Sequence, residues 1–240
     1  MNICEQALGH IVGGLVLDIA TGRGSFIGIL KRFLQSYTEI AGIDISEAFL
    51  KDAQNNYGEE NIHFSRVDAE HLSFRDESFH TVSAAKSLHH WANVSQVLSE
   101  MKRVLKPEGY IIVSDMHREV QTEAQRTDMY IHHFGAKVHR MCGFTHNKTF
   151  TRQEIVDSVM DFGFCKVLSY DWSDTSSDPM DTENVREKEE VIDRILQFAQ
   201  EMPNYEAIER QGEQLRQRLY KVGIQSEPVV VVVGKKLQKG

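Results

Sequence analysis

Cysteine is scarce in this chain of 240 residues, and its three copies, Cys4, Cys142 and Cys165, show no paired spacing. A disulfide framework is therefore not expected, and a reducing cytoplasm is the expected compartment. The sequence also opens without a leader of charged and then apolar residues. Its longest purely apolar run, Val229 to Val233, is far too short to span a bilayer. These features predict a cytoplasmic protein without a membrane span.

The chain lacks a Lys/Arg-rich stripe with interleaved aromatic residues, which argues against a nucleic-acid partner. Its formal charge of −8 is concentrated in one segment. Residues 171–190 hold eight acidic side chains against Arg186 and Lys188, a local charge of −6 that leaves −2 for the rest. We interpret this segment as a solvated, mobile loop.

Residues 14–24, G-L-V-L-D-I-A-T-G-R-G, have the pattern of a buried strand, a tight turn and the start of a helix. Glycines in such a turn allow a ligand to lie against bare backbone, while the N–H groups of the following helix point at it. A dinucleotide-binding turn needs a small residue three positions after the second glycine, and Ile27 fits that requirement badly. Nicotinamide-dependent redox chemistry is therefore disfavoured.

Strand and helix patterns alternate five times up to residue 115, which favours a doubly wound, mainly parallel sheet of the α/β class. The second half predicts a helical segment over 117–143, a helix from Thr151 to Phe162, a sixth strand over 165–172 and a last one over 228–233. Two amphipathic helical patterns between the last two strands predict an αα hairpin over 184–222. The leading residues Asn2 to Ile11 predict a short helix.

The first half resembles the class I S-adenosylmethionine (SAM) dependent methyltransferases, especially the type 11 group that includes the ubiquinone and menaquinone C-methyltransferases. The resemblance lies in the glycine turn, in Asp44 twenty positions after Gly24, in Asp68-Ala69, in F-H-T-V-S-A-A-K-S-L-H-H-W over 79–91 and in L-K-P-E-G over 105–109. It implies a single domain over 1–240 with a seven-stranded Rossmann-like sheet. The SAM-binding half would be 12–116, and the helical insertions 117–150 and 173–226 would form a lid or a dimer element.

The resemblance also implies which residues contact the cofactor. Asp44 would accept both ribose hydroxyls, and Asp68 with its neighbour would contact the adenine amino group. The full set of expected cofactor contacts is Asp18, Ala20, Thr21, Gly22, Gly24, Asp44, Ile45, Asp68, Ala69, Ala85 and Lys86.

Several residues depart from the family pattern. Ala20 and Glu108 each stand where a glycine is common, and His80 stands where an Asp usually opens the fourth strand. Arg23, between the two glycines, either reaches the cofactor carboxylate or is solvated. Lys86 either binds a carboxylate, of the cofactor or of an acidic substrate, or points outward.

Histidines supply the candidate catalytic groups. His89, His90 and His117 are candidate bases, although an activated methyl group needs mainly a nucleophile held in line, so a base is optional. A second set, His132, His139, Cys142 and His146, would share one face of an unbroken helix and could ligate a metal. Gly143 is expected to end the helix before His146, so we favour a substrate-facing polar lid and predict no metal.

The sequence thus predicts methyl transfer from SAM to a small-molecule acceptor by in-line attack on the sulfonium methyl. The alternative is a protein that binds SAM or its demethylated product as a sensor or scaffold without turnover. The apolar stripes of the αα hairpin could also serve as the contact surface of a homodimer. The acceptor atom stays open, because fold does not select it.

Overall fold

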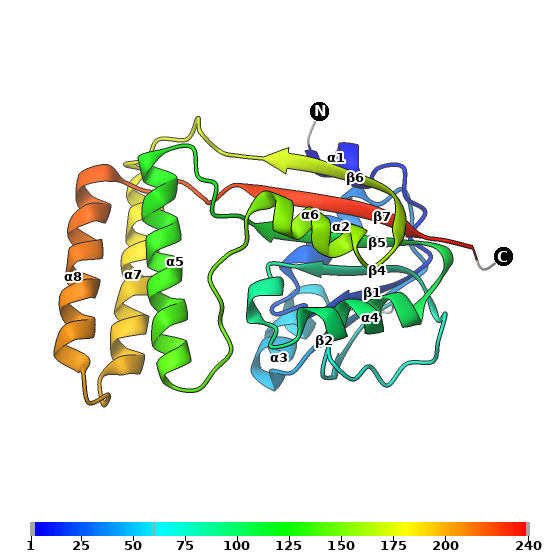
Figure 1. Ribbon diagram of the computed structural model, residues 1–240, viewed down its shortest axis with the longest axis horizontal. Coiled ribbons are helices and arrows are strands. Elements are labelled where there is room, and N and C mark those ends of the chain that lie inside the picture. The colour runs from blue at the N-terminus through cyan, green and yellow to red at the C-terminus, as the bar shows by residue number, and fades with distance from the viewer. Residues whose placement is uncertain (1–2, 60, 239–240) are drawn as a thin grey trace. The chain divides into compact units, whose positions relative to one another are not determined.

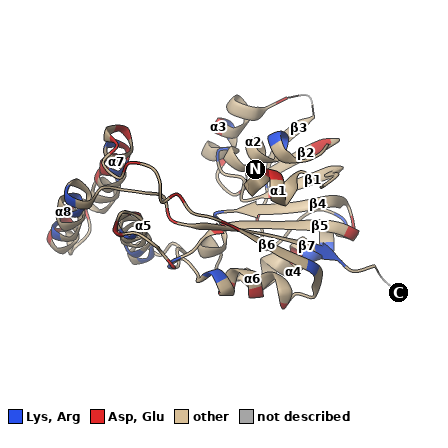
Figure 2. Cartoon of the chain, turned by 90° about the horizontal axis from the view of Figure 1, so that it is seen from above, with Lys and Arg blue, Asp and Glu red and all other residues tan. Residues whose placement is uncertain are grey.

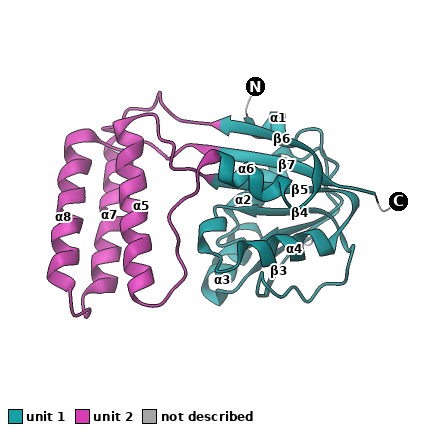
Figure 3. Cartoon of the chain, in the orientation of Figure 1, with its two compact units in different colours: residues 1–115, 153–171, 230–240 teal, residues 116–152, 172–229 magenta. Residues whose placement is uncertain are grey.

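The computed structural model describes residues 3–59 and 61–238, which divide into two compact units (Figures 1 and 3). Unit 1 comprises residues 1–115, 153–171 and 230–240, and unit 2 comprises 116–152 and 172–229. The sheet lies in unit 1, and three long helices make up most of unit 2. Whether the insertions act as a lid or a dimer element stays a prediction.

Unit 1 is built on a seven-stranded sheet with the order β3-β2-β1-β4-β5-β7-β6. The β1–β2, β1–β4, β2–β3 and β4–β5 pairs are parallel, and β7 runs opposite to β6 (Figure 1). The strands are β1 (Leu15–Ile19), β2 (Glu39–Asp44), β3 (Ile62–Arg66), β4 (Phe79–Ala85), β5 (Leu105–Met116), β6 (Phe164–Trp172) and β7 (Val229–Lys236). The α/β class and the mainly parallel seven-stranded sheet are confirmed.

Helices cover both faces of this sheet. Figure 2 shows α1 (Ile3–Leu8), α2 (Ser25–Phe33) and α3 (Glu47–Tyr57) on one side, and α4 (Val94–Val104) and α6 (Arg152–Met160) on the other. The predicted first residue of the leading helix, Asn2, lies outside the described residues. The core on the α1–α2 side includes the aliphatic side chains of Leu8, Ile27 and Ile40, each at most 1% exposed.

Local sequence signals explain the helix starts in unit 1. The Ser46 hydroxyl accepts a hydrogen bond from Phe49 N and caps α3, and the Asn93 side chain caps α4 in the same way. The L-K-P-E-G segment was expected to be a turn between a helix and a strand. It instead forms an irregular bulge inside β5, where the paired residue moves from Leu105 to Tyr110.

Unit 2 contains α5 (Glu123–Met141), α7 (Thr182–Ala199) and α8 (Tyr205–Val222). A capping box between Thr122 and Gln125 begins α5. The three helices pack on one another around an apolar core of their own. Its most buried members include Ile131 and Phe134 on α5, Ile192 on α7 and Leu219 on α8.

The acidic segment 171–190 is not a loop throughout, which corrects the interpretation drawn from its charge. From Thr182 onward it forms the first half of α7, begun by the Asp181 side chain, which accepts from Asn184 N. The apolar face of the helix packs into the unit 2 core, and Arg186 pairs with Glu183 and Glu190 on its exposed side. Intrahelical pairing and burial of the apolar face stabilise a helix that charge density alone argues against.

Candidate functional site

The carboxyl ends of β1 and β2 bring the predicted glycine turn and Asp44 together. Gly22 N donates to Asp44 Oδ2 over 2.9 Å, and Ser46 N donates to Oδ1 over 2.9 Å. The two strands are adjacent and parallel, so their carboxyl ends lie at one edge of the sheet. An acidic acceptor therefore sits directly beside the backbone of the turn.

The turn itself has the backbone shape that its small residues suggest. Gly22 and Gly24 have φ angles of 55° and 82°. A side chain at Gly24 would collide with the Tyr57 ring, whereas a Cβ at Gly22 would meet no atom within 4 Å. The space beside Gly22 is thus open to a ligand. Ala20 also has a positive φ of 52°, a backbone conformation in which a Cβ is strained.

Asp18, at the end of β1, lies beneath the turn and is 1% exposed. Its carboxylate accepts from Thr21 Oγ1 over 2.6 Å and from Ser83 Oγ over 2.7 Å. Burial raises the pKa of Asp18 to about 6, because desolvation of the charged form outweighs these two hydrogen bonds. Asp18 therefore braces the turn from within the protein, and Thr21 is buried with it.

The other expected cofactor contacts surround this edge. Ile45 is 64% exposed directly after Asp44. Asp68 is exposed after β3, and its Oδ1 accepts from Glu70 N over 2.9 Å. Ala69 and Ala85 are half-buried. Lys86 is exposed, has a φ of 51°, and donates its backbone N–H to Ser114 O over 2.7 Å.

Arg23 turns away from the turn backbone. Its Nε donates to Asp52 on α3 over 3.0 Å, and its guanidinium lies 5.3 Å from the centre of the Phe49 ring. The side chain is 68% exposed, which matches the solvated alternative for this residue. His80 lies at the opposite, amino end of β4, where its Nδ1 accepts from Leu15 N.

A buried carboxylate that sequence reasoning did not select stands beside His89. Asp115 is fully buried near the end of β5, and its Oδ2 accepts from Ser87 N and Leu88 N over 3.1 and 2.9 Å. Its Oδ1 lies 3.4 Å from His89 Nδ1. The signal in the sequence was an acidic residue at the end of an apolar strand, the same signal that marked Asp18 and Asp44.

The three candidate bases are in different surroundings. His89 is 1% exposed, while His90 is exposed and its ring centre is 4.2 Å from that of His89. His117 belongs to unit 2, where it is 6% exposed and its Nδ1 lies 3.8 Å from Glu119 Oε2. Among these, His89 has the buried carboxylate that can fix the orientation of its ring.

The second histidine set lies wholly in unit 2 and is only partly assembled. His146 contacts both His132 and His139, but Cys142 does not join them, because its Sγ points to Met202 Sδ at 3.8 Å. Gly143, with a φ of 84°, follows the end of α5, as the sequence predicted. Burial lowers the pKa of His139.

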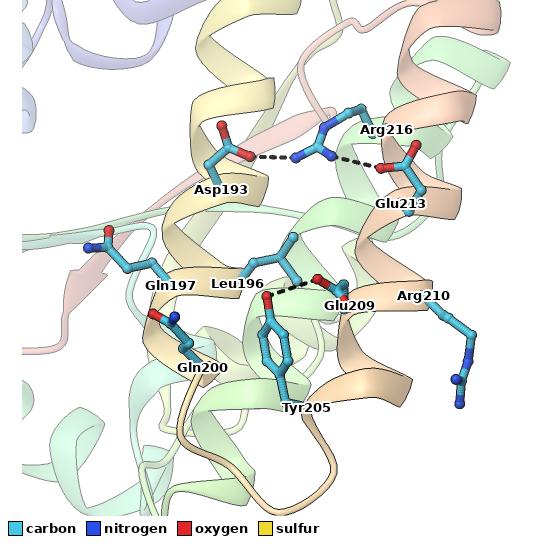
Figure 4. Close-up of a pocket in the computed structure, with 9 residues that line it drawn as sticks. All are labelled: Asp193, Leu196, Gln197, Gln200, Tyr205, Glu209, Arg210, Glu213 and Arg216. Atoms are coloured by element: carbon cyan, nitrogen blue, oxygen red, sulfur yellow. Dashed lines mark hydrogen bonds and ion pairs between the residues drawn. The ribbon is translucent and has the colours of Figure 1, made fainter.

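Unit 2 also has a groove between α7 and α8, shown in Figure 4. Arg216 extends across it, with Nη2 on Asp193 and Nη1 on Glu213, and Tyr205 donates to Glu209. The remaining lining residues are Leu196, Gln197, Gln200 and Arg210. Its polar groups are largely paired with one another, so the groove is a helix–helix contact lined with charge.

The sheet order, the glycine turn and the acidic residue after β2 define a class I SAM-dependent methyltransferase domain. Within it, residues 17–113 match the family model described as a methyltransferase domain, and this match bears out the resemblance to the type 11 group. Among the described residues, no helix is both long and apolar enough to cross a membrane.

Named relatives match part of the chain. The chain is 37% identical over 120 residues to phthiotriol/phenolphthiotriol dimycocerosates methyltransferase 1 of Mycobacterium ulcerans, covering 48% of this chain and 43% of that protein. It is 30% identical over 159 residues to demethylmenaquinone methyltransferase of Chlorobaculum parvum, covering 64% and 63%. The matched region thus spans less than two thirds of either relative.

A solved structure of Haemonchus contortus phosphoethanolamine N-methyltransferase 2, in complex with phosphomonomethylethanolamine and S-adenosylhomocysteine, has the same fold. Its TM-score is 0.58 at 16% sequence identity, covering 98% of this chain and 52% of that one. SAM is the cofactor of this class of domain. The open space at Gly22 and the adjacent Asp44 carboxylate leave room and a hydrogen-bond acceptor for that cofactor.

Proposed function

We propose that this chain transfers the methyl group of SAM to a small-molecule acceptor. The observation that carries this proposal is the position of Asp44, whose carboxylate lies 2.9 Å from Gly22 N beside open space. A carboxylate there can accept from two adjacent ribose hydroxyls, and the turn can approach the ligand without side-chain collision.

The other strand ends supply the remaining cofactor contacts in this proposal. The N–H groups of Gly22 and Gly24 donate within the turn, to Asp44 Oδ2 and Thr21 O, so the glycines contribute close backbone approach rather than free donors. Ile45 offers an exposed apolar surface for the adenine ring. Asp68 and Ala69 face the adenine amino group. Ala85 and Lys86 lie along the methionine portion, where the Lys86 ammonium can pair with a carboxylate of the cofactor or of the acceptor.

The cofactor supplies a methyl group already activated by its sulfonium. The acceptor atom attacks in line, so that its bond to the methyl carbon forms as the carbon–sulfur bond breaks, and holding the two close provides most of the acceleration. His89 takes the proton that the acceptor releases. Asp115 keeps the His89 ring oriented and stabilises its charged form.

The acceptor class is proposed from the named relatives, because a base at His89 would serve any acceptor that releases a proton. We propose an acceptor with an ionisable hydroxyl or an acidic carbon. The relatives named for demethylmenaquinone and for phthiotriol dimycocerosates motivate lipids with such groups as the first acceptors to assay.

Titration calorimetry with SAM and with S-adenosylhomocysteine tests the cofactor site. Asp44→Ala should weaken binding at least ~10-fold, because it removes a charge-assisted acceptor for two hydroxyls. Asp52→Ala is the matched control, since that carboxylate is on the neighbouring helix and pairs with the exposed Arg23. Equal affinity of Asp44→Ala and the parent would refute the assignment.

Turnover separates the enzyme from a sensor. Release of S-adenosylhomocysteine is measured against hydroquinone, phenol and carbon-acid acceptors. Turnover that needs both an acceptor and Asp44 supports the enzyme. Tight cofactor binding without turnover on any acceptor class would favour the sensor instead.

A further inference from the structure

Three histidine side chains of unit 2 gather at the end of α5. His132 and His139 are seven positions apart, two helical turns, so they lie on one face of the helix. Gly143 follows the helix with a left-handed backbone and reverses the chain, which carries His146 back onto that face. Arg140 donates through Nη1 to the His146 carbonyl and holds the returning segment in place.

The two contacts that His146 makes have different lengths. Its Nδ1 lies 2.9 Å from His139 Nδ1, the ordinary length of a hydrogen bond between ring nitrogens. Its Nε2 lies 3.3 Å from His132 Nε2, longer than that ordinary length. The rings of His132 and His146 are nearly perpendicular, at 85°.

The longer distance fits two ligands of one metal ion. Zinc–imidazole bonds are about 2.0–2.1 Å, so two nitrogens at a tetrahedral zinc lie about 3.3 Å apart. The same separation suits other divalent ions that prefer imidazole, such as Ni²⁺ and Cu²⁺.

Although the sequence pattern favoured a polar lid without a metal, we propose from this geometry that His132 and His146 bind a divalent transition-metal ion through their Nε2 atoms, and that His139 positions His146. His146 then donates its Nδ1–H to His139 Nδ1, which fixes the tautomer that leaves Nε2 as the ligand atom. Metal-bound histidines usually have such an outer partner. Water or a further donor completes the coordination sphere.

The burial of the site is consistent with an ordered ligand set. His146 is 7% exposed, and His132 and His139 are half-buried. The site lies within the described part of unit 2 and does not depend on methyl transfer. A structural ion there would tie the segment after α5 to the helix.

Zinc binding is measured on untagged, metal-depleted full-length protein by competition with a chromophoric chelator. His132→Ala and His146→Ala should each weaken zinc binding at least ~10-fold. His139→Ala should weaken it by about 10-fold or more, because outer-partner removal costs about 10–100-fold. His63→Ala is the control, since that side chain is 60% exposed in unit 1. Equal zinc affinity of the parent and His146→Ala would overturn the proposal.

Thermal unfolding of the parent protein provides a second test, which remains informative if the alanine variants fold poorly. Zinc should raise the thermal unfolding temperature of the parent protein, because a ligand that binds only the folded state stabilises it. It should leave His146→Gln, of similar size, unchanged. A parent protein that zinc does not stabilise, with its imidazoles joined by hydrogen bonds alone, would refute the metal site.

Discussion

Asp115 holds His89 from beneath the carboxyl end of the sheet: its Oδ1 is 3.4 Å from His89 Nδ1, and its Oδ2 accepts two backbone N–H groups of the turn that carries the histidine. One carboxylate therefore holds the backbone of this turn through hydrogen bonds and lies within ion-pair distance of the ring. Since both residues are at most 1% exposed, water competes little for these contacts.

Asp115→Asn should lower kcat by ~10-fold or more while the Kd for SAM stays unchanged. The amide oxygen can still accept from Ser87 N and Leu88 N, but the neutral side chain no longer stabilises a protonated His89. The measurement is kcat across pH together with calorimetric SAM binding. An unaltered pH profile would show that the pair is purely structural.

Asp18 should make the folded protein less stable as the pH rises. The pKa of its buried carboxyl is about 6, against an ordinary value of 3.8, so the folded chain holds a proton there that the unfolded chain releases. This contribution is fully present below about pH 4 and is lost as the pH rises through 6.

Asp18→Asn removes that titration. Relative to this variant, the parent should lose ~2 kcal/mol of unfolding free energy between pH 4.5 and 7.5, from a shift of about two pKa units at about 1.4 kcal/mol each. Urea unfolding at several pH values measures it, and the exposed Asp52→Asn serves as the control. Parallel curves for parent and Asp18→Asn would contradict the raised pKa.

Ala20→Gly should stabilise the protein by ~0.5–1 kcal/mol, because Ala20 is held at a φ of 52° where a Cβ is strained. Glu108→Gly, with a φ of 60°, should behave in the same way. Ala53→Gly inside α3 should destabilise by ~1 kcal/mol or more, since glycine is a poor helix former. The midpoints of chemical unfolding of the three variants and the parent measure these changes. A loss of stability in Ala20→Gly would show that the strain is absent.

Arg216→Ala should destabilise unit 2 by ~1 kcal/mol. The guanidinium is 23% exposed and reaches three carboxylates, Asp193 and Glu189 on α7 and Glu213 on α8. Arg210→Ala is the matched control on α8, because that side chain is 71% exposed and makes one long pair of 3.9 Å with Glu206. The loss of stability caused by Arg216→Ala, measured by urea unfolding, should be smaller at high salt than at low salt. Arg210→Ala should show no such salt dependence.

Local pattern predicted much of the fold. Glu39 to Asp44 forms a strand with the expected bounds, and Ser46 caps the next helix, because period and capping depend on residues a few positions apart. Charge misled the interpretation of 171–190, since intrahelical pairs and burial of the opposite face outweigh repulsion there. The bulge in β5 also escaped prediction, because it depends on pairing with β4.

The sequence by itself determined the turn at 14–24, its acidic neighbours and thereby the family, because strand ends and glycine positions are legible along the chain. Only the tertiary structure joined Asp115 to His89 and carried His146 back to His132 while turning Cys142 towards Met202. Those contacts connect residues far apart in sequence. They depend on strand order and on the direction in which the chain leaves a helix. The spacing of apolar residues within one segment contains no information about either.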